Sequence, residues 1–344
     1  MKIIIAILMF SFIILVHEFG HFILAKKNGI VVNEFCLGLG PTLVGVQKGE
    51  TKYSIKLLPF GGACIMLGED EESVLEGAFN QKSVWARISV VLAGPVFNFV
   101  LAFVLAIILL SNIGYDAPVI SEIIEGFPAQ EAGLQKGDRI VKINDKDIHL
   151  YREALFYSQF MSTDKETKLV YERDGKRYET SIMPKLDKKS GRYLLGYSSG
   201  VRVKGNPLTT LKYSAYEVKY NICTTIDSLK LLVGGKVKVN QLSGPVGIVD
   251  MIGDSYDATK ESGAFSVWLT MINISIFLTA NLGVMNLLPI PALDGGRLVF
   301  LLIEAIRGKR VPESKEGMVH LVGMVLLMGL MVFVLFNDIR KIFF

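Results

Sequence analysis

The stretch IIIAILMFSFIILVHEFGHFILA, residues 3–25, decides the fold of this chain because it is apolar and long enough to cross a lipid bilayer as a helix. Such a crossing needs about 20 residues. Three ionisable side chains, His17, Glu18 and His21, interrupt the apolar run. Ionisable groups are costly in hydrocarbon and mark functional positions. The run therefore predicts a transmembrane helix that carries a functional site.

Three further runs are apolar and long enough to cross a bilayer, namely residues 88–110, 265–288 and 318–336. Apolar residues make up 51% of the chain, more than an ordinary soluble domain contains. No small-residue cleavage site follows the first run, so we interpret it as a retained span and not as a signal peptide. The chain is expected to be a multi-pass α-helical membrane protein with four transmembrane helices. Two of these helices belong to an N-terminal membrane part, residues 1–112, and two to a C-terminal membrane part, residues 264–344.

The polar sequence lies between these runs. Residues 31–68 are rich in glycine and contain alternating patches, which predicts short strands and turns. Residues 113–186 contain several strand-like stretches and predict one small soluble β-rich domain. Residues 187–263 are expected to form a linker that includes an amphipathic helix over residues 207–233.

Charge and cysteine content exclude several classes of protein. The net charge is only +4 and no dense basic run occurs, so no nucleic-acid partner is expected. The three cysteines, Cys36, Cys64 and Cys223, lie far apart and form no CxxC pair. Neither a disulfide framework nor a cysteine zinc site is therefore predicted.

The basic residues predict an orientation in the membrane. They follow the first span at 26–27 and lie between the third and fourth spans at 307–310. Loops rich in lysine and arginine face the cytoplasm, which places residues 116–263 outside it. The basic pair at 340–341 argues the other way.

His17, Glu18 and His21 form an H-E-x-x-H motif. Helical spacing puts the two imidazoles on one face, within reach of one ion. Zinc favours such a site, with three protein ligands and an open position for water. The bound water has a pKa of about 7, and Glu18 can take its proton and deliver it to the leaving amine. The alternative is two core histidines in a helix bundle, which the position inside a membrane span disfavours.

A third ligand is needed for such a zinc site. The metzincin pattern would require histidine at position 27, where this chain has Lys27. His149 falls in the soluble domain and is poorly placed, whereas His320 near the start of the fourth span stays open. The better candidate is Asp294, within NLLPIPALDGGR, residues 286–297.

The residues around Asp294 favour an irregular backbone. Pro289 and Pro291 lack N–H donors and break the third span, and such backbone is tolerated at membrane depth only where protein or a wet cavity surrounds it. Gly295 permits close approach of other backbone, and Asn286 adds a hydrogen-bonding group. The alternative is a plain turn in which Asp294 caps the next helix.

Several of these stretches together are similar to one known family. HEFGH with NLLPIPALDGG resembles the site-2 protease family of intramembrane zinc metalloproteases, of the bacterial regulator-of-sigma-E protease type. The similarity covers essentially the whole chain. The other stretches that resemble the family are LGLGP (37–41), LLPFGGACIMLGED (57–70), AGPVFNF (93–99), LSGPVGI (242–248) and FNDIRK (336–341).

This resemblance implies an activity and a location. It implies an intramembrane zinc endopeptidase in which His17, His21 and Asp294 hold Zn²⁺ and Glu18 is catalytic. It also implies regulated proteolysis in the bacterial cytoplasmic membrane, on membrane proteins that another protease has already cut. Anti-sigma factors and remnant signal peptides are the implied substrates.

The soluble domain resembles a bacterial PDZ domain. The stretch GFPAQEAGLQKGDRIVKINDKDI, residues 126–148, carries the similarity. A PDZ domain binds an extended peptide by adding it to a sheet edge, so peptide C-termini are expected partners. The resemblance implies an extracytoplasmic PDZ domain and a membrane-associated β-segment over residues 31–68. Some relatives carry two PDZ modules, but this chain has room for one.

The β-segment predicts a way of holding substrate. A strand over residues 60–68, including Gly61 and Gly62, could pair with a locally unwound substrate, with Asn286 bonding it from the other side. Unpaired backbone in lipid costs several kcal/mol per group, which pairing would offset. Gly94 and Asn98 in the second span are expected to support the site, chiefly by close packing.

Two functions from other classes compete with proteolysis. A metal transporter could use the H-E-x-x-H cluster as a transit site, although transporters usually show pathway residues in several spans. A non-catalytic membrane scaffold could bind tails through the PDZ domain, although an intact Glu18 argues against it.

Overall fold

The computed structural model describes nearly the whole chain. It forms two compact units, residues 1–105 with 225–344 and residues 106–224, which are taken in turn. The described residues are 2–69, 73–159, 165–187, 192–198, 201–235 and 244–343. The first two residues of LSGPVGI and the last of LLPFGGACIMLGED lie outside them.

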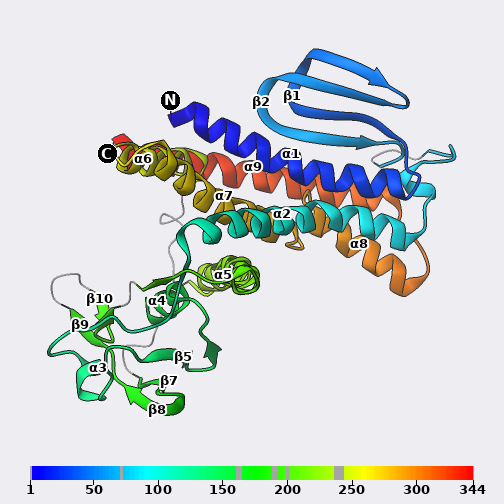
Figure 1. Cartoon of the computed structure of the whole chain (residues 1–344). Helices are drawn as coiled ribbons and strands as arrows, with labels where there is room; N and C mark the ends of the chain where they lie inside the picture. Colours follow the sequence, from blue (N-terminus) through cyan, green and yellow to red (C-terminus); the bar gives the residue numbers. More distant parts are fainter. Residues whose placement is uncertain are drawn as a thin grey trace. The chain divides into compact units, whose positions relative to one another are not determined.

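Four helices of the described chain are long and apolar enough to span a membrane, as the hydropathy predicts. They are α1 (Lys2–Lys27), α2 (Val84–Ile113), α7 (Ala264–Asn286) and α9 (Glu313–Phe343). In Figure 1 α1, α7 and α9 run alongside one another with the first part of α2. The third helix ends at Asn286 and not at Leu288, because the backbone leaves the helix ahead of Pro289.

Small residues let these helices approach closely. A Cβ on Gly20 would lie 2.5 Å from the Ala93 carbonyl oxygen. The backbones of α1 and α2 are therefore in close contact at this point. A Cβ on Gly283 would lie 2.7 Å from the Phe99 ring, which brings α7 onto α2. Close approach of backbones at small residues is how membrane helices gain packing energy. It brings the polar face of α1 against α2.

Two shorter helices complete this unit. Helix α6 (Pro245–Lys260) follows Gly244, and α8 (Asp294–Arg307) follows the loop 287–293. The buried carboxylate of Asp338, on α9, accepts hydrogen bonds from the N–H groups of Gly244 and Gly247 at 3.0 and 2.9 Å. Asp338 therefore satisfies the free donors at the start of α6. This contact joins the sequence stretches GPVGI and FND.

The segment after α1 is a β-hairpin whose ladder is broken into short stretches. Strands β1 (Val32–Lys48) and β2 (Thr51–Met66) pair antiparallel, and a short 3₁₀ helix, η1 (Phe79–Gln81), follows. Phe35 pairs with Tyr53 and also with Cys64. Residues 34–37 therefore lie between two portions of β2, and the portion 62–65 forms an edge. Strands expected over residues 31–68 are confirmed, but they are two long strands with several register shifts and not a set of short ones.

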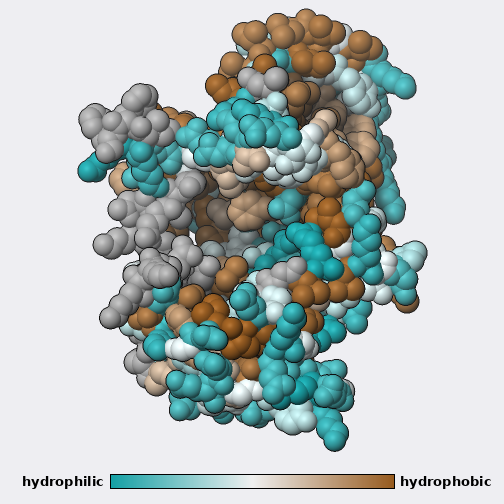
Figure 2. All heavy atoms as spheres, turned by 60° about the vertical axis from the view of Figure 1, so that its left-hand side comes forward, coloured by the Kyte–Doolittle hydropathy of each residue, from teal (hydrophilic) through white to brown (hydrophobic). Residues whose placement is uncertain are grey.

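The tip of this hairpin exposes apolar side chains. Figure 2 shows them as a brown surface at the top of the molecule. Exposed apolar patches of this kind mark contact with protein or lipid, which fits the expected association of the segment with a membrane. The residues are Leu39, Leu43, Val44, Val46, Ile55, Leu57 and Leu58.

The second unit is built on a four-stranded antiparallel sheet in the order β6-β5-β7-β8. These strands are β5 (Arg139–Ile143), β6 (Lys146–Asp147), β7 (Thr167–Arg173) and β8 (Lys176–Ile182). Helices α3 (Pro128–Glu131) and α4 (Tyr151–Gln159) accompany the sheet (Figure 1). The buried core includes Ile120, Ile140, Ile143, Leu169, Ile182 and Leu195.

Three two-stranded pairs extend this unit past residue 186. Strand β4 (Glu122–Ile123) pairs with β11 (Tyr197–Ser198), and β3 (Tyr115–Asp116) pairs with β12 (Arg202–Val203). Strand β9 (Lys185–Asp187) pairs with β10 (Arg192–Leu194). Because Leu195 belongs to the same core, the chain after residue 186 is part of this fold.

Helix α5 (Pro207–Val233) has the bounds expected for the amphipathic helix. Its buried residues recur at helical spacing and include Tyr213, whose ring stacks on Tyr115 at 3.5 Å between centroids. Arg152 on α4 donates to the carboxylates of Glu217 and Asp116 at 2.5 and 3.2 Å. One guanidinium thus holds the buried Glu217 and the partly buried Asp116 within this unit.

Candidate metal centre and active site

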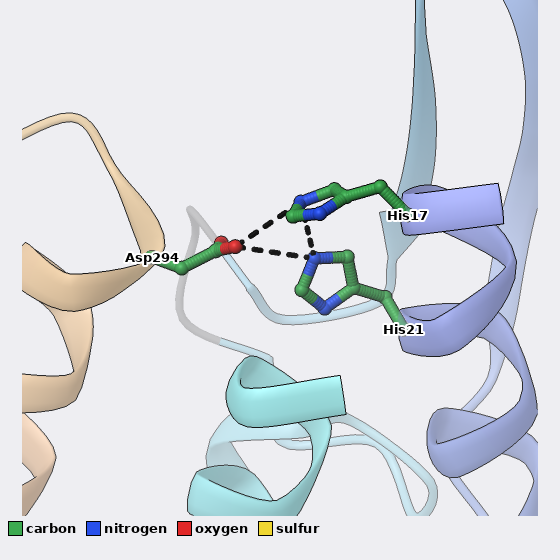
Figure 3. Close-up of side chains that lie close together, drawn as sticks. All are labelled: His17, His21 and Asp294. Carbon is green, nitrogen blue, oxygen red and sulfur yellow. Dashed lines mark hydrogen bonds and ion pairs between the residues drawn. The ribbon is translucent and has the colours of Figure 1, made fainter. Parts of the chain in front are cut away.

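Three side chains from two distant parts of the sequence converge in the membrane unit. His17 and His21 project from one face of α1, and Asp294 projects toward them from the start of α8 (Figure 3). The His17 and His21 Nε2 atoms lie 3.2 Å apart. Asp294 Oδ2 lies 3.2 Å from the first and 3.5 Å from the second. This is the one group with metal-ligand geometry found among the described residues.

The triangle of ligand atoms has the size that tetrahedral zinc requires. Zinc binds imidazole nitrogen and carboxylate oxygen at about 2.0–2.2 Å, so two of its ligands lie about 3.3–3.5 Å apart at the tetrahedral angle. The three observed separations, 3.2, 3.2 and 3.5 Å, agree with that value. Both histidines are buried. The residues present therefore fit a zinc ion.

Hydrogen bonds orient both imidazoles. His21 Nδ1 lies 2.8 Å from the carbonyl oxygen of Val90 on α2. A carbonyl only accepts, so Nδ1 carries the proton and Nε2 keeps its lone pair for the centre of the triangle. His17 Nδ1 lies 3.0 Å from the side-chain amide of Asn98, which is fully buried. Asn98 thus contacts a candidate ligand directly and does more than pack.

Gly94 creates the space in which the imidazoles sit. A Cβ at this position would lie 2.3 Å from His21 Nε2 and 2.6 Å from His17 Cε1. Contacts below 3.0 Å force a movement of one partner. The α2 backbone therefore forms the wall behind both rings, and only glycine leaves room for them.

The loop 287–293 positions Asp294. Asp294 is the first residue of α8, while Leu293 is its N-cap and makes no side-chain capping bond. The Asp294 side chain is consequently turned to the histidines and does not cap the helix. A Cβ on Gly295 would lie 2.1 Å from the Leu288 carbonyl oxygen, so the first turn of α8 packs on the loop backbone. Pro289 and Pro291 lie within this loop.

Asn286, the last residue of α7, faces the same cluster. Its Nδ2 lies 3.4 Å from His17 Nε2. The distance is long for a hydrogen bond, so the amide lies beside His17 without a strong bond to it. Thr279, two turns earlier, donates to the Asn98 carbonyl oxygen at 3.2 Å and ties α7 to α2.

Glu18 lies between the triangle and the edge of the β-segment. Its Oε2 accepts a hydrogen bond from the Cys64 N–H at 2.9 Å. A Cβ on Gly62 would lie 3.3 Å from Glu18 Cγ, so the small residue lets the strand come close to α1. Gly61, at φ +84°, occupies backbone space that favours glycine and turns the chain just before this edge. The backbone of β2 thus holds the Glu18 carboxylate.

A cavity of about 720 Å³ opens onto these groups. The edge residues 62–66 line one side of it and Asp294 another. Its other side carries charged groups, of which Arg87 pairs with Glu304 and Arg297 pairs with Glu69. A cavity with charged walls admits water, which peptide hydrolysis consumes.

The structure separates the two remaining histidines from the cluster. His149 belongs to the other unit, where its ring stacks on Tyr216 at 3.9 Å. His320 lines the cavity, but its Nδ1 accepts the Ala292 N–H at 2.9 Å and it is absent from the ligand triangle. The option of His320 as third ligand is therefore not supported, and Asp294 takes that place in the geometry.

Sequence reasoning missed two groups that orient the site, the Val90 carbonyl and the Cys64 N–H. Both are backbone groups, which every residue carries, so no residue type signals them. His320 was named as a possible ligand near the start of an apolar span, but its hydrogen bond to the Ala292 N–H was not predicted.

Comparison with known proteins gives a consistent result. Residues 5–330 match the sequence profile of Peptidase family M50. A relative from Clostridium acetobutylicum is 40% identical, covering 98% of this chain and 97% of that protein. The zinc metalloprotease RasP of Bacillus licheniformis is 32% identical and the regulator of sigma-W protease RasP of Bacillus subtilis 30%, each covering 98% of both chains.

Solved structures of PDZ domains match a part of the chain. Among them is the PDZ domain of an SdrC-like protein from Listeria innocua, 24% identical, with a TM-score of 0.23. The match covers 26% of this chain and all of that structure.

Proposed function

The chain belongs to peptidase family M50, the site-2 protease family, and is a zinc metalloprotease of the membrane; from this premise we propose that His17, His21 and Asp294 bind its zinc ion and that Glu18 is the general base. The observation that carries the proposal is the triangle of three ligand atoms, whose sides are those of a tetrahedral zinc site. Nothing found favours the transporter or the scaffold.

Glu18 performs the proton transfers. Zinc, when bound, acts as a Lewis acid on the scissile carbonyl and lowers the pKa of water to about 7. Glu18 takes the proton of the attacking water and passes it to the leaving amine nitrogen. The Cys64 N–H holds one oxygen of this carboxylate, so the side chain stays aimed while its charge changes.

Asn98 sets the tautomer of His17 in this proposal. A zinc-binding Nε2 requires the proton on Nδ1, and that proton needs an acceptor. Asn98 Oδ1 is buried and has no hydrogen-bond partner in the described part of the chain, while Nδ2 lies beside Nδ1. Exchange of the Asn98 amide oxygen and nitrogen, which leaves the shape of the side chain unchanged, gives the Nδ1–H its acceptor. Gly94 supplies the space.

The edge 62–65 presents the substrate. A transmembrane helix hides its carbonyls in i→i−4 bonds, so the segment to be cut must unwind next to the catalytic groups. Pairing with this edge at Gly62 replaces the lost bonds, and Asn286 bonds the segment from the opposite side. The position of the edge along the cavity wall and beside Glu18 supports this role.

The PDZ domain binds peptide C-termini in this proposal. A small cavity of about 50 Å³ lies between β11 and α4, lined by apolar side chains and by Gly196. Its lining suits the end of an extended apolar peptide, added alongside a strand. In this proposal the domain lies on the extracytoplasmic side of the bacterial inner membrane, which the basic residues at 26–27 and 307–310 support through the positive-inside rule.

The substrates we propose are membrane proteins with one transmembrane segment, trimmed beforehand by another protease. The name of the Bacillus subtilis relative, a regulator of sigma-W protease, supports anti-sigma factors as one class. Remnant signal peptides are the second class. Both classes have a free chain end on the outer side of the membrane, which the PDZ domain can bind.

The test compares wild type with Glu18→Gln on a single-span substrate that lacks its outer domain, in detergent with added zinc. Loss of a general base lowers the rate about 10²–10⁴-fold. The variant should lose cleavage by at least about 100-fold and still bind zinc. Equal cleavage by both proteins would refute Glu18 as the base. A protease known to cut the same substrate serves as the positive control.

A further inference from the structure

The loop that positions Asp294 contains a residue with strained backbone, and a side chain from another helix forms a hydrogen bond with it. Ala292 has φ +74°, in the left-handed region that a residue with a side chain rarely adopts. Such a conformation persists only where the surroundings hold it. Pro289 and Pro291 precede Ala292 in the loop and have no N–H to contribute. The Ala292 N–H donates to His320 Nδ1 at 2.9 Å.

His320 belongs to α9 and contacts the loop together with Gly323, which lies one helical turn later. A Cβ on Gly323 would lie 2.3 Å from Pro291 Cβ, so α9 rests directly on the loop backbone. The His320 ring lies 5.7 Å from the ring of Phe300 on α8, and its Nε2 lies 3.8 Å from Glu316 Oε1. Because Nδ1 accepts, the proton is on Nε2, toward Glu316.

Helix α9 is otherwise the least packed span. Only 6% of the residues in its most apolar stretch are buried, compared with 22–44% in the other three candidate spans. Its far end is fixed by the contact of Asp338 with the start of α6. Near the site, His320 accepts a hydrogen bond from the loop at Ala292, two residues before Asp294.

We propose that His320 is a positioning residue for zinc binding: by holding the Ala292 N–H it keeps the loop in the conformation that aims Asp294 at the two histidines. This inference rests on the proposed function. A ligand set must be held to within about 0.5 Å, and a backbone hydrogen bond next to the ligand is a direct means of doing so. His320 touches neither metal nor substrate in this role.

The test measures zinc affinity of the purified full-length protein by competition with a chelator. His320→Leu keeps a side chain of comparable bulk but removes the acceptor, and its zinc affinity should fall about 10–100-fold, as for other groups that orient ligands. His320→Asn places its Oδ1 where the histidine Nδ1 lies and so keeps the acceptor. Its zinc affinity should stay within about threefold of wild type. If the leucine variant fails to fold, His320→Gln, whose oxygen lies one bond further out, replaces it and should also lose affinity.

Two controls separate this inference from its premise. Asp338→Asn weakens the other tether of α9 and should lower thermal stability while leaving zinc affinity unchanged. Asp294→Asn should lose zinc affinity if the proposed ligand set is right. If Asp294→Asn loses zinc while His320→Leu, or the His320→Gln variant that replaces it, binds zinc like wild type, His320 has no positioning role. If Asp294→Asn binds zinc like wild type, the proposed ligand set itself is wrong, and His320 loses its role with it.

Discussion

Replacing Gly94 with alanine should abolish zinc binding without unfolding the protein. The new Cβ would lie 2.3 Å from His21 Nε2, whereas a normal contact needs about 3.4 Å, so the rings must retreat by roughly 1 Å. Zinc tolerates ligand distances only within about ±0.2 Å. Affinity should fall by at least about 100-fold, equivalent to about 2.7 kcal/mol.

The same substitution should not harm the helix itself. Alanine is favoured over glycine inside a helix by about 1 kcal/mol, so the metal-free protein should melt at the same temperature as wild type or higher. Gly329→Ala is the matched control, because a Cβ at that position in α9 meets no atom within 4 Å. Chelator competition and thermal unfolding in detergent measure both quantities. Zinc affinity of Gly94→Ala equal to that of Gly329→Ala would refute the steric reasoning.

Two further predictions concern a tautomer and a titration. Asn98→Ala removes the acceptor for His17 Nδ1–H and should weaken zinc binding about 10–100-fold, whereas Asn98→Asp keeps an acceptor and should bind more tightly than Asn98→Ala; the reverse order of affinities would contradict the proposed amide orientation. In the second unit, burial and the nearby Asp116 raise the pKa of Glu217 to about 7, despite the opposing charge of Arg152. A carboxyl whose pKa is higher in the folded protein stabilises the fold fully below its unfolded pKa and loses that contribution as the pH rises through about 7. Hydrogen exchange of α5 should therefore quicken from pH 6 to 8 beyond the intrinsic change, and Glu217→Gln should remove this excess, whereas an excess kept by the variant would assign it to another group.

The local features of this protein were readable from the sequence. Hydropathy predicted the four long helices, because a span must be continuously apolar to lie in lipid. The spacing of His17 and His21 predicted their shared face, because helical periodicity is a local property. Glycine and alternation predicted the broken strands over residues 31–68.

The identity of the third group in the triangle was readable only by elimination. Asp294 was favoured because two prolines make the surrounding backbone irregular at membrane depth, while His320 stayed open. The tertiary structure brings the Asp294 carboxylate to 3.2 Å from His17 and ties His320 to a backbone N–H. Nothing in either residue type distinguishes these outcomes, since both can bind a metal.

The sequence by itself determined which segments are long apolar helices and which side chains are the candidates for the chemistry, because both follow from residue type and short-range spacing. Only the tertiary structure decided how these side chains are aimed. That depends on the Val90 carbonyl, the Cys64 N–H and the empty space at Gly94. Backbone groups are the same at every position and space is a property of packing, so these contacts appear only once distant segments of the chain have come together.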